Sequence, residues 1–136
     1  MLRRKSRATA ARPKRKDRTG ISFENKALEL VKALGFEAQT TSRSADGGVD
    51  IIAESRKPFI SGRYIIQCKD WKNPVGEPTL RDLLGAVQKN KAVKGILISR
   101  SAFTRSARDF AQGTPLELID GGNIEALIEQ AKPPGD

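Results

Sequence analysis

Three polar residues stand within or at the end of apolar segments, where their types could perform metal-assisted chemistry. Asp50 interrupts the apolar segment 49–53, and an ionised carboxylate in such a segment is costly unless another group compensates it. Gln67 and Lys69 close the next apolar run two residues apart, so in a strand both side chains would project from one face. If the two strands are neighbours, the three side chains converge near the strand ends.

Such a group could hold a hard divalent cation beside a lysine. A carboxylate and an amide oxygen are suitable ligands for Mg²⁺ or Mn²⁺, the backbone carbonyl of Cys68 could add another oxygen, and water would fill the rest. Lys69 would then orient or polarise the attacking water and stabilise negative charge on a phosphate in the transition state. This set is chemically sufficient for phosphodiester hydrolysis and poorly suited to acyl transfer.

Simpler interpretations of the same residues remain open. Asp50 could belong to a structural hydrogen-bond network, or form a buried salt bridge with Lys69 that is itself an uncertain stabiliser. A Gln-x-Lys triplet is also frequent by chance. The order of features favours the active-site interpretation, because a Gly-Gly turn, an acid in an apolar strand, a hairpin and the Gln-x-Lys ending follow one another.

The composition excludes several kinds of catalytic site. The chain of 136 residues has no histidine, which rules out a Cys/His zinc site and a Ser-His-Asp triad. Its one cysteine, Cys68, cannot form an intramolecular disulfide, and since it alternates with the site residues we interpret it as a packed core side chain. Any catalysis must therefore use carboxylates, lysine, amides, hydroxyls or a metal held by oxygen ligands.

The net charge of +9 favours a polyanionic partner such as DNA and is concentrated at the N-terminus. Residues 1–19 contain nine basic residues and one acid, a net +8 that leaves +1 for the remainder. This segment has too few apolar residues to offset its ordering entropy, so we predict a disordered basic arm. The arm is either a solvated extension or a non-specific phosphate-binding arm, whose contacting residues would be Arg12, Lys14, Arg15 and Lys16.

The remaining residues, 20–136, predict one domain of mixed α/β structure. Helices are expected over 22–34, 78–90, 104–112 and 123–131, and strands over 36–41, 49–53, 63–69, 95–99 and 116–119. Ser22 and Thr104 are expected to cap their helices. A meander of strands followed by βα alternation implies a mixed sheet with helices on both faces. No apolar run approaches the roughly 20 residues of a membrane span, and no secretory signal is evident, so we expect a cytoplasmic protein.

Five stretches of the chain resemble the catalytic domain of Mrr-like restriction endonucleases, a branch of the PD-(D/E)XK nuclease superfamily. They are ISFENKALELVKALGFEA (21–38), DGGVDII (46–52), YIIQCKDWKNPVG (64–76), AFTRSARDFA (102–111) and LELIDGGNIEALI (116–128). The resemblance implies a restriction-endonuclease-like three-layer fold, with a central mixed sheet flanked by helices, and a Mg²⁺-dependent endodeoxyribonuclease.

The same resemblance assigns roles to individual residues. It implies that Asp50 is the metal-binding aspartate, Gln67 a glutamine in place of the usual acid, and Lys69 the catalytic lysine. Glu24, in the first helix, matches an acid that helps the metal site, whereas the sequence pattern alone would make it a surface helix residue. Because Gln67 carries no charge, weak metal affinity is expected if Glu24 points elsewhere.

The resemblance also affects the expected specificity. Restriction enzymes of this type carry a separate DNA-reading domain, and we do not expect one in these 136 residues. Its absence would favour structure-selective or rather unspecific cleavage. The likeness extends to Holliday-junction resolvases, which are also small and lack a recognition domain.

Further candidates for DNA contact are basic or polar residues in loops and at helix starts: Lys72, Asn73, Arg81, Thr104 and Arg105. Exposed backbone N–H groups at helix starts could bind phosphates, although capping alone would explain Thr104. Trp71 could contact DNA or cover an edge of the core. Asp46 could approach a metal through water, but a turn-forming role is the simpler interpretation.

Three functions are compatible with this sequence. The first is an endonuclease acting by metal-assisted, in-line water attack in defence or in DNA repair and recombination. The second is a DNA-binding module on a nuclease-like scaffold, and the third is an interaction protein that is active only with a partner. One site cuts one strand, so double-strand cleavage or junction resolution would require two opposed sites, and we therefore expect a homodimer.

Overall fold

The computed structural model of the chain describes residues 22–43 and 49–131. The predicted basic arm, with Arg12, Lys14, Arg15 and Lys16, lies outside the described residues, as do Asp46 and the Gly-Gly turn that follows it. These predictions therefore stay as they were made.

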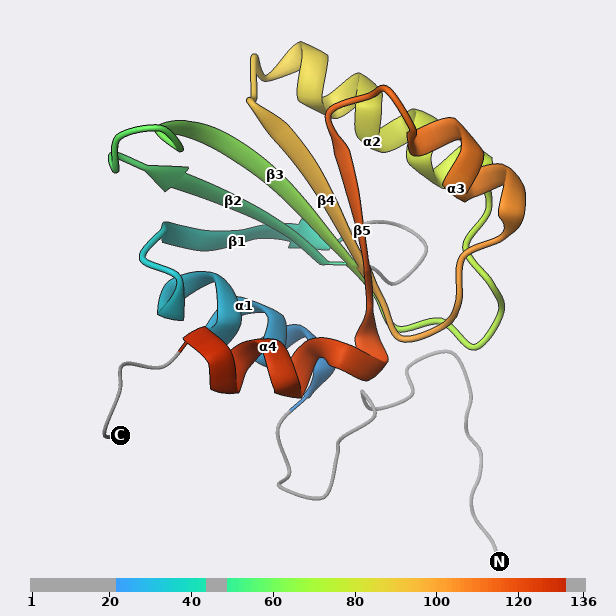
Figure 1. Ribbon diagram of the computed structural model, residues 1–136, viewed down its shortest axis with the longest axis horizontal. Helices are drawn as coiled ribbons and strands as arrows, with labels where there is room; N and C mark the ends of the chain where they lie inside the picture. The colour runs from blue at the N-terminus through green and yellow to red at the C-terminus, as the bar shows by residue number, and fades with distance from the viewer. Residues whose placement is uncertain (1–21, 44–48, 132–136) are drawn as a thin grey trace, which may run out of the picture.

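The described residues form a five-stranded sheet in the order β1-β2-β3-β4-β5 (Figure 1). The strands are β1 (Glu37–Arg43), β2 (Val49–Ser55), β3 (Gly62–Lys69), β4 (Lys94–Ser99) and β5 (Leu116–Asp120). The first three strands form an antiparallel meander, whereas β3, β4 and β5 are parallel. The predicted mixed sheet is confirmed.

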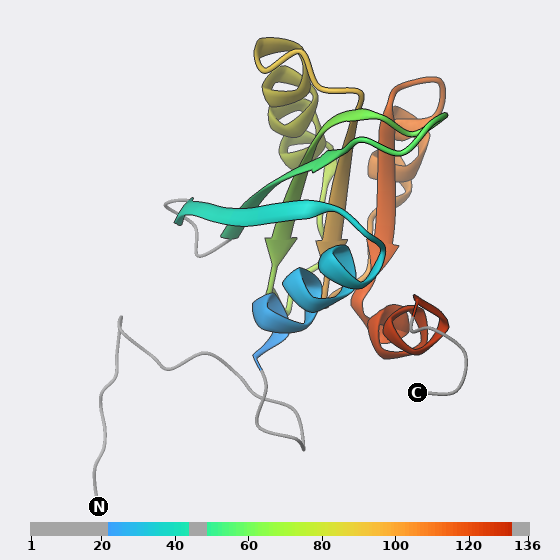
Figure 2. The ribbon, with the colours of Figure 1, turned by 90° about the vertical axis from the view of Figure 1, so that its left-hand side faces the viewer.

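Helices cover both faces of this sheet, which gives three layers (Figures 1 and 2). They are α1 (Phe23–Ala33), α2 (Glu77–Lys89), α3 (Arg105–Ala111) and α4 (Ile124–Ala131), the last preceded by a short 3₁₀ turn at Gly121–Asn123. The parallel crossovers place α2 and α3 on one face, while the first and last helices pack side by side on the other. Within the described ranges, no helix is long and apolar enough to cross a membrane.

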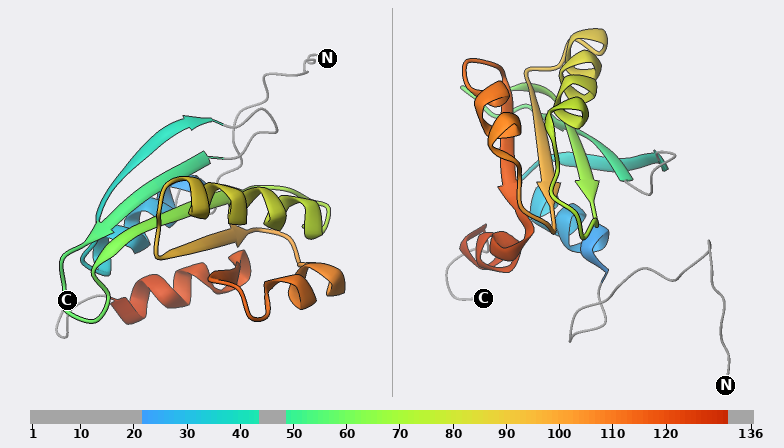
Figure 3. Two further views of the ribbon diagram at one scale, coloured as in Figure 1. Left: turned by 90° about the horizontal axis from the view of Figure 1, so that it is seen from above. Right: turned by 90° about the vertical axis from the view of Figure 1, so that its right-hand side faces the viewer.

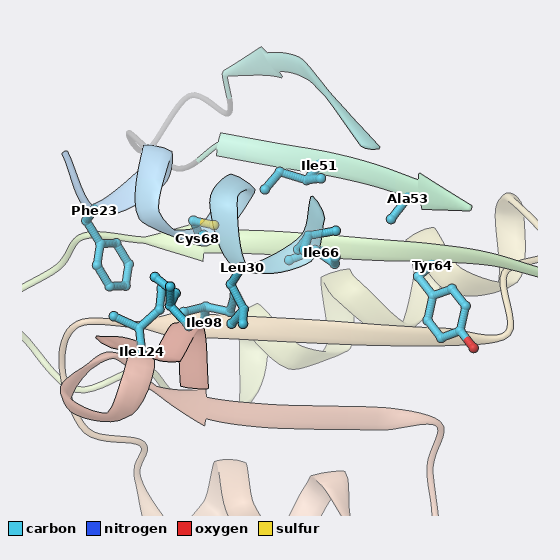
Figure 4. Close-up of a cluster of buried hydrophobic side chains, with 12 residues drawn as sticks. Phe23, Leu30, Ile51, Ala53, Tyr64, Ile66, Cys68, Ile98 and Ile124 are labelled. Carbon is cyan, nitrogen blue, oxygen red and sulfur yellow. The ribbon is translucent and has the colours of Figure 1, made fainter. Parts of the chain in front are cut away.

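The two faces of the sheet belong to two separate cores. Ile51, Ile66 and Cys68 pack with α1 and α4, as the close-up in Figure 4 shows. Ile65 and Leu97, which alternate with such residues, pack with α2 and α3. Because side chains alternate along a strand, the polar residues Asp50, Gln67 and Lys69 share the face of α2 and α3.

That second face is covered only in part. The helix α2 packs on β3, β4 and β5. When the molecule is seen from above, β1 and β2 lie beside α2, with no described helix over them (Figure 3). Asp50 and Ile52, two β2 residues on this face, are both partly exposed.

The predicted helix starts follow from side-chain capping. Ser22 caps α1 by accepting a hydrogen bond from the backbone of Asn25 (3.2 Å), and Thr104 caps α3 in the same way. The first helix ends before Gly35, which takes a positive φ of 98° that favours glycine. All nine predicted elements are present in the predicted order, and their ends differ by at most two residues.

Candidate active site

Asp50 and Gln67 are direct partners in the antiparallel ladder between β2 and β3. Side chains opposite each other in such a ladder have Cβ atoms about 4.5–5.5 Å apart and point to the same face. Both residues are partly exposed, so solvent or a ligand can reach them. The neighbouring strand is irregular at this level, between Thr40 and Arg43, and irregularities of this kind often re-aim side chains beside functional sites.

Lys69 lies two residues beyond Gln67 on the same face of β3, about 6.6 Å further along the strand. The residue is only 4% exposed, although a lysine is seldom buried without compensation. Its Nζ atom lies 4.9 Å from the centre of the Trp71 ring. Its backbone oxygen accepts a hydrogen bond from the Arg100 amide (3.1 Å), which fixes the end of β3 against the segment after β4.

The loops that follow β3 and β4 are tied together beside this lysine. Ser99, the β4 residue in register with Lys69, is fully buried, and its Oγ lies 3.0 Å from the Oγ of Ser101. The Ser101 hydroxyl donates to the backbone oxygen of Asn73 (2.7 Å). Neither serine was predicted from the sequence, although Ser99 ends an apolar strand as Lys69 does.

The start of α1 lies at the same end of the sheet. The Arg100 guanidinium lies 4.7 Å from the centre of the Phe23 ring and is paired with Asp70. Figure 2 shows the carboxyl ends of β3 and β4 pointing towards this part of α1. The first helical turn is therefore close to the end of β3.

Glu24, in that first turn, is only 6% exposed, and its Oε1 atom is buried. It is therefore not a surface helix residue. The helix that carries it covers the face opposite to Asp50, Gln67 and Lys69. Glu24 lies near the end of the sheet that carries Lys69, and its contribution to a metal site stays a prediction.

The donor set fits a weakly held, hard divalent cation. Among the residues that the structure describes, no three acidic or cysteine side chains gather as a metal-holding group. A cation at Asp50 would therefore have at most one further acid, such as Glu24, and would also use the Gln67 amide oxygen, backbone carbonyls and water, a mixture that suits Mg²⁺. The Cys68 side chain is fully buried in the opposite core, so only its backbone carbonyl could contribute.

The residues predicted to contact DNA differ in their surroundings. Lys72 and Asn73 are exposed in the loop directly after the site. Arg81 is exposed, but its Nε donates to Glu77 (2.7 Å) and its guanidinium lies over the Phe110 ring.

Thr104 and Arg105 stand at the start of α3. The Thr104 hydroxyl accepts from the Ala107 amide (3.1 Å), and its own amide donates to the backbone oxygen of Val75 (2.9 Å). These two hydrogen bonds give Thr104 a structural role, since it caps α3 and anchors the loop that contains Val75. The Arg105 side chain is 95% exposed and lies 3.9 Å from Asp109, so it is accessible to a phosphate.

Solved structures of similar shape define the fold class. The DNA modification-dependent restriction endonuclease AspBHI aligns with a TM-score of 0.61 and 21% identity, over 78% of this chain and 30% of that chain. A protein of unknown function, AF1548, aligns with a TM-score of 0.60 and 21% identity, over 79% of this chain and 65% of that chain. The protein therefore has the restriction-endonuclease-like fold.

Sequence comparison identifies the family within this class. Residues 16–128 match the family model of the restriction endonuclease catalytic domain of the Mrr type, and the chain belongs to this family. It is similar to the type IV methyl-directed restriction enzyme EcoKMrr of Escherichia coli (strain K12), with 35% identity over 112 residues. That alignment covers 78% of this chain and 36% of the relative, so the chain spans about a third of the relative's length.

Proposed function

We propose that this chain is a metal-dependent DNA endonuclease that hydrolyses phosphodiester bonds with Asp50, Gln67 and Lys69. The main support is the ladder register, which sets a carboxylate directly opposite an amide, with a buried lysine on the same face and strand end. Membership in the restriction endonuclease family makes DNA the expected substrate. Asp50 is partly exposed, so a phosphate can reach its carboxylate.

The metal would be held by the Asp50 carboxylate, the Gln67 amide oxygen and the Cys68 carbonyl, with Glu24 as a second acid. When bound, a divalent cation would polarise the phosphate and make water a stronger nucleophile. Lys69 would orient or polarise the attacking water, which would approach phosphorus in line with the leaving oxygen. As the water oxygen bonds to phosphorus it gives up a proton to solvent. One backbone P–O bond breaks, its electron pair stays on the leaving oxygen, and that oxygen takes up a proton from solvent.

Lys69 would stabilise the charge that develops on the phosphate. An ammonium group has three donors and no acceptor, so it can donate to non-bridging phosphate oxygens. Since the residue is nearly out of solvent, its interaction with an anion is less screened than on the surface. The lysine would act mainly in the transition state, and its loss should lower kcat rather than DNA affinity.

DNA contacts outside the site would come from exposed cations near it. Lys72 and Arg105 are exposed at the end of the sheet where the site lies, with Asn73 and Arg81 as further contacts. The basic arm would add affinity that falls as salt concentration rises. Two copies of the chain, with opposed sites, would be needed to cut both strands of a duplex.

A DNA-binding module without catalysis is the second candidate function. The observation that favours it is the charge distribution, since residues 1–19 carry +8 of the net +9. In that case the basic arm alone would account for DNA binding. A Holliday-junction resolvase would instead show a preference among DNA forms.

The test is a cleavage assay on supercoiled plasmid, linear duplex, single strand and four-way junction, each with Mg²⁺, Mn²⁺ or EDTA. We expect metal-dependent products that disappear in Asp50→Asn and Lys69→Met while DNA binding remains. Two exposed residues of α2 give matched controls, Asp82→Asn and Lys89→Met, which should cleave as the unmodified chain does. No product on any DNA form would overturn the enzyme proposal, and binding that depends only on residues 1–19 would favour the binding module.

A further inference from the structure

Trp71, the only tryptophan of the chain, lies directly beside the proposed catalytic lysine. It follows Lys69 by two residues and packs partly buried against the core shared with α2 and α3. The centre of its ring is 4.9 Å from the Lys69 Nζ. The ring face therefore contacts the ammonium group at the carboxyl end of β3.

An aromatic face is suited to holding this ammonium group in place. A ring attracts a cation through its quadrupole, and the attraction is larger when the cation is removed from water, as the 4% exposure of Lys69 indicates. The ring itself carries no net charge, so its attraction for the ammonium group acts through the ring face. The contact with the ring therefore restricts where the ammonium group lies.

Trp71 is itself fixed on both sides in the sequence. The preceding residue, Asp70, is paired with Arg100 after β4. Beyond it, the backbone oxygen of Asn73 accepts from the Ser101 hydroxyl (2.7 Å).

A second contact with the β4–α3 connection follows a few residues later. The Val75 amide donates to the Ala102 oxygen (2.9 Å), which forms an isolated bridge with the β4–α3 connection. The loop that carries Trp71 is therefore anchored to the neighbouring connection before and after the ring.

We propose that Trp71 is a positioning residue for Lys69. The Trp71 ring fixes the Lys69 ammonium group where water attacks the phosphate. This inference rests on the proposed endonuclease function. Trp71 acts through Lys69 and touches no reacting atom, which distinguishes it from a DNA-stacking residue. Its role also goes beyond covering the core. A DNA-stacking residue and a core residue would each give a different experimental result.

The kinetic test compares Trp71→Phe with Trp71→Leu in the full chain. The leucine variant should lose about tenfold in kcat at an unchanged KM, the range expected for a partly desolvated cation–ring contact, whereas phenylalanine should stay within about threefold of the unmodified chain. A raised KM with kcat retained would show that Trp71 contacts DNA. Equal activity of the two variants would show that Trp71 only covers the core. A raised KM with kcat retained, or equal activity of the two variants, overturns the inference.

Controls separate positioning from loss of stability. Phe36→Leu removes another partly buried ring, one that packs against Tyr64 in the other core, and should reduce stability without lowering kcat. If Trp71→Leu unfolds, Trp71→Met supplies a second non-aromatic side chain for the same comparison. A kcat loss in Phe36→Leu as large as that in Trp71→Leu would contradict a specific role for Trp71.

A measurement independent of activity follows the contact itself. In the NMR spectrum, the ε-methylene protons of Lys69 should lie upfield of those of exposed Lys72, and should move to the exposed position in Trp71→Leu. A chain that cleaves DNA while Lys69 shows exposed shifts overturns this inference and leaves the proposed function standing. A chain with the upfield shifts but no metal-dependent cleavage overturns the proposed function, and the inference falls with it.

Discussion

Replacing Gln67 by glutamate would place two carboxylates directly opposite each other on β2 and β3. With the Cβ atoms about 5 Å apart, their repulsion is about 3 kcal/mol at an effective dielectric of about 20 and about 1 kcal/mol in water. Asp50 and Gln67 are both partly exposed, so screening favours the lower part of this range. We expect the free energy of unfolding of Gln67→Glu to fall by about 1–2 kcal/mol when no divalent cation is present.

A divalent cation bound between residues 50 and 67 should reverse this loss in the free energy of unfolding. Two carboxylates bind Mg²⁺ more tightly than one carboxylate and an amide, and a ligand that binds only the folded state stabilises it by mass action. Urea unfolding in EDTA and at rising Mg²⁺ concentrations measures both halves of the prediction. Gln39→Glu is the matched control, since Gln39 shares the exposed face but lies opposite Ile52.

Two results would refute this reasoning. The first is a Gln67→Glu variant whose free energy of unfolding is the same in EDTA and in Mg²⁺. The second is a Gln39→Glu control with an equal response to Mg²⁺, which would show that the ion acts on surface charge in general. Either outcome would mean that Asp50 and Gln67 do not share a cation.

Further predictions concern packing, anchoring and DNA affinity. Gly95→Ala should lower the free energy of unfolding by about 1–3 kcal/mol in urea melts, because the added Cβ would lie 2.6 Å from a methyl group of Val87. Ser99→Ala should cost about 1 kcal/mol, measured by thermal unfolding, since the Ser101 amide and hydroxyl both lose a partner. Deleting residues 1–19 should weaken DNA binding and make its logarithmic salt dependence shallower by about 0.9 per lost phosphate contact, measured by anisotropy titration.

The regular elements could be predicted from the sequence because their signals are local. Ser22 and Thr104 indicated where two helices begin, because both are typical N-cap residues. Gly35 indicated the end of the first helix. The end of β2 was predicted two residues too early, because Glu54 and Ser55 are polar. They remain in the strand through pairing with Arg63 and Gly62, a contact between distant residues that apolar spacing does not reveal.

The candidate site was predictable in its strand positions and not in its loops. The alternation of side chains put Gln67 and Lys69 on one face, and a hairpin made Asp50 the natural partner. The contact between Lys69 and Trp71 depends on the path of the chain after the strand ends, where periodicity no longer applies. The burial of Glu24 was likewise hidden, since its neighbours in the sequence suggest an exposed position.

The central claim is that Asp50 and Gln67 together hold a divalent cation beside Lys69. Anomalous diffraction from crystals grown with Mn²⁺ tests this most directly, because the signal locates the ion without reference to activity. We expect a peak within bonding distance of the Asp50 carboxylate and the Gln67 amide oxygen. A crystal that binds Mn²⁺ elsewhere, or leaves these two side chains without a peak at saturating Mn²⁺, would contradict it.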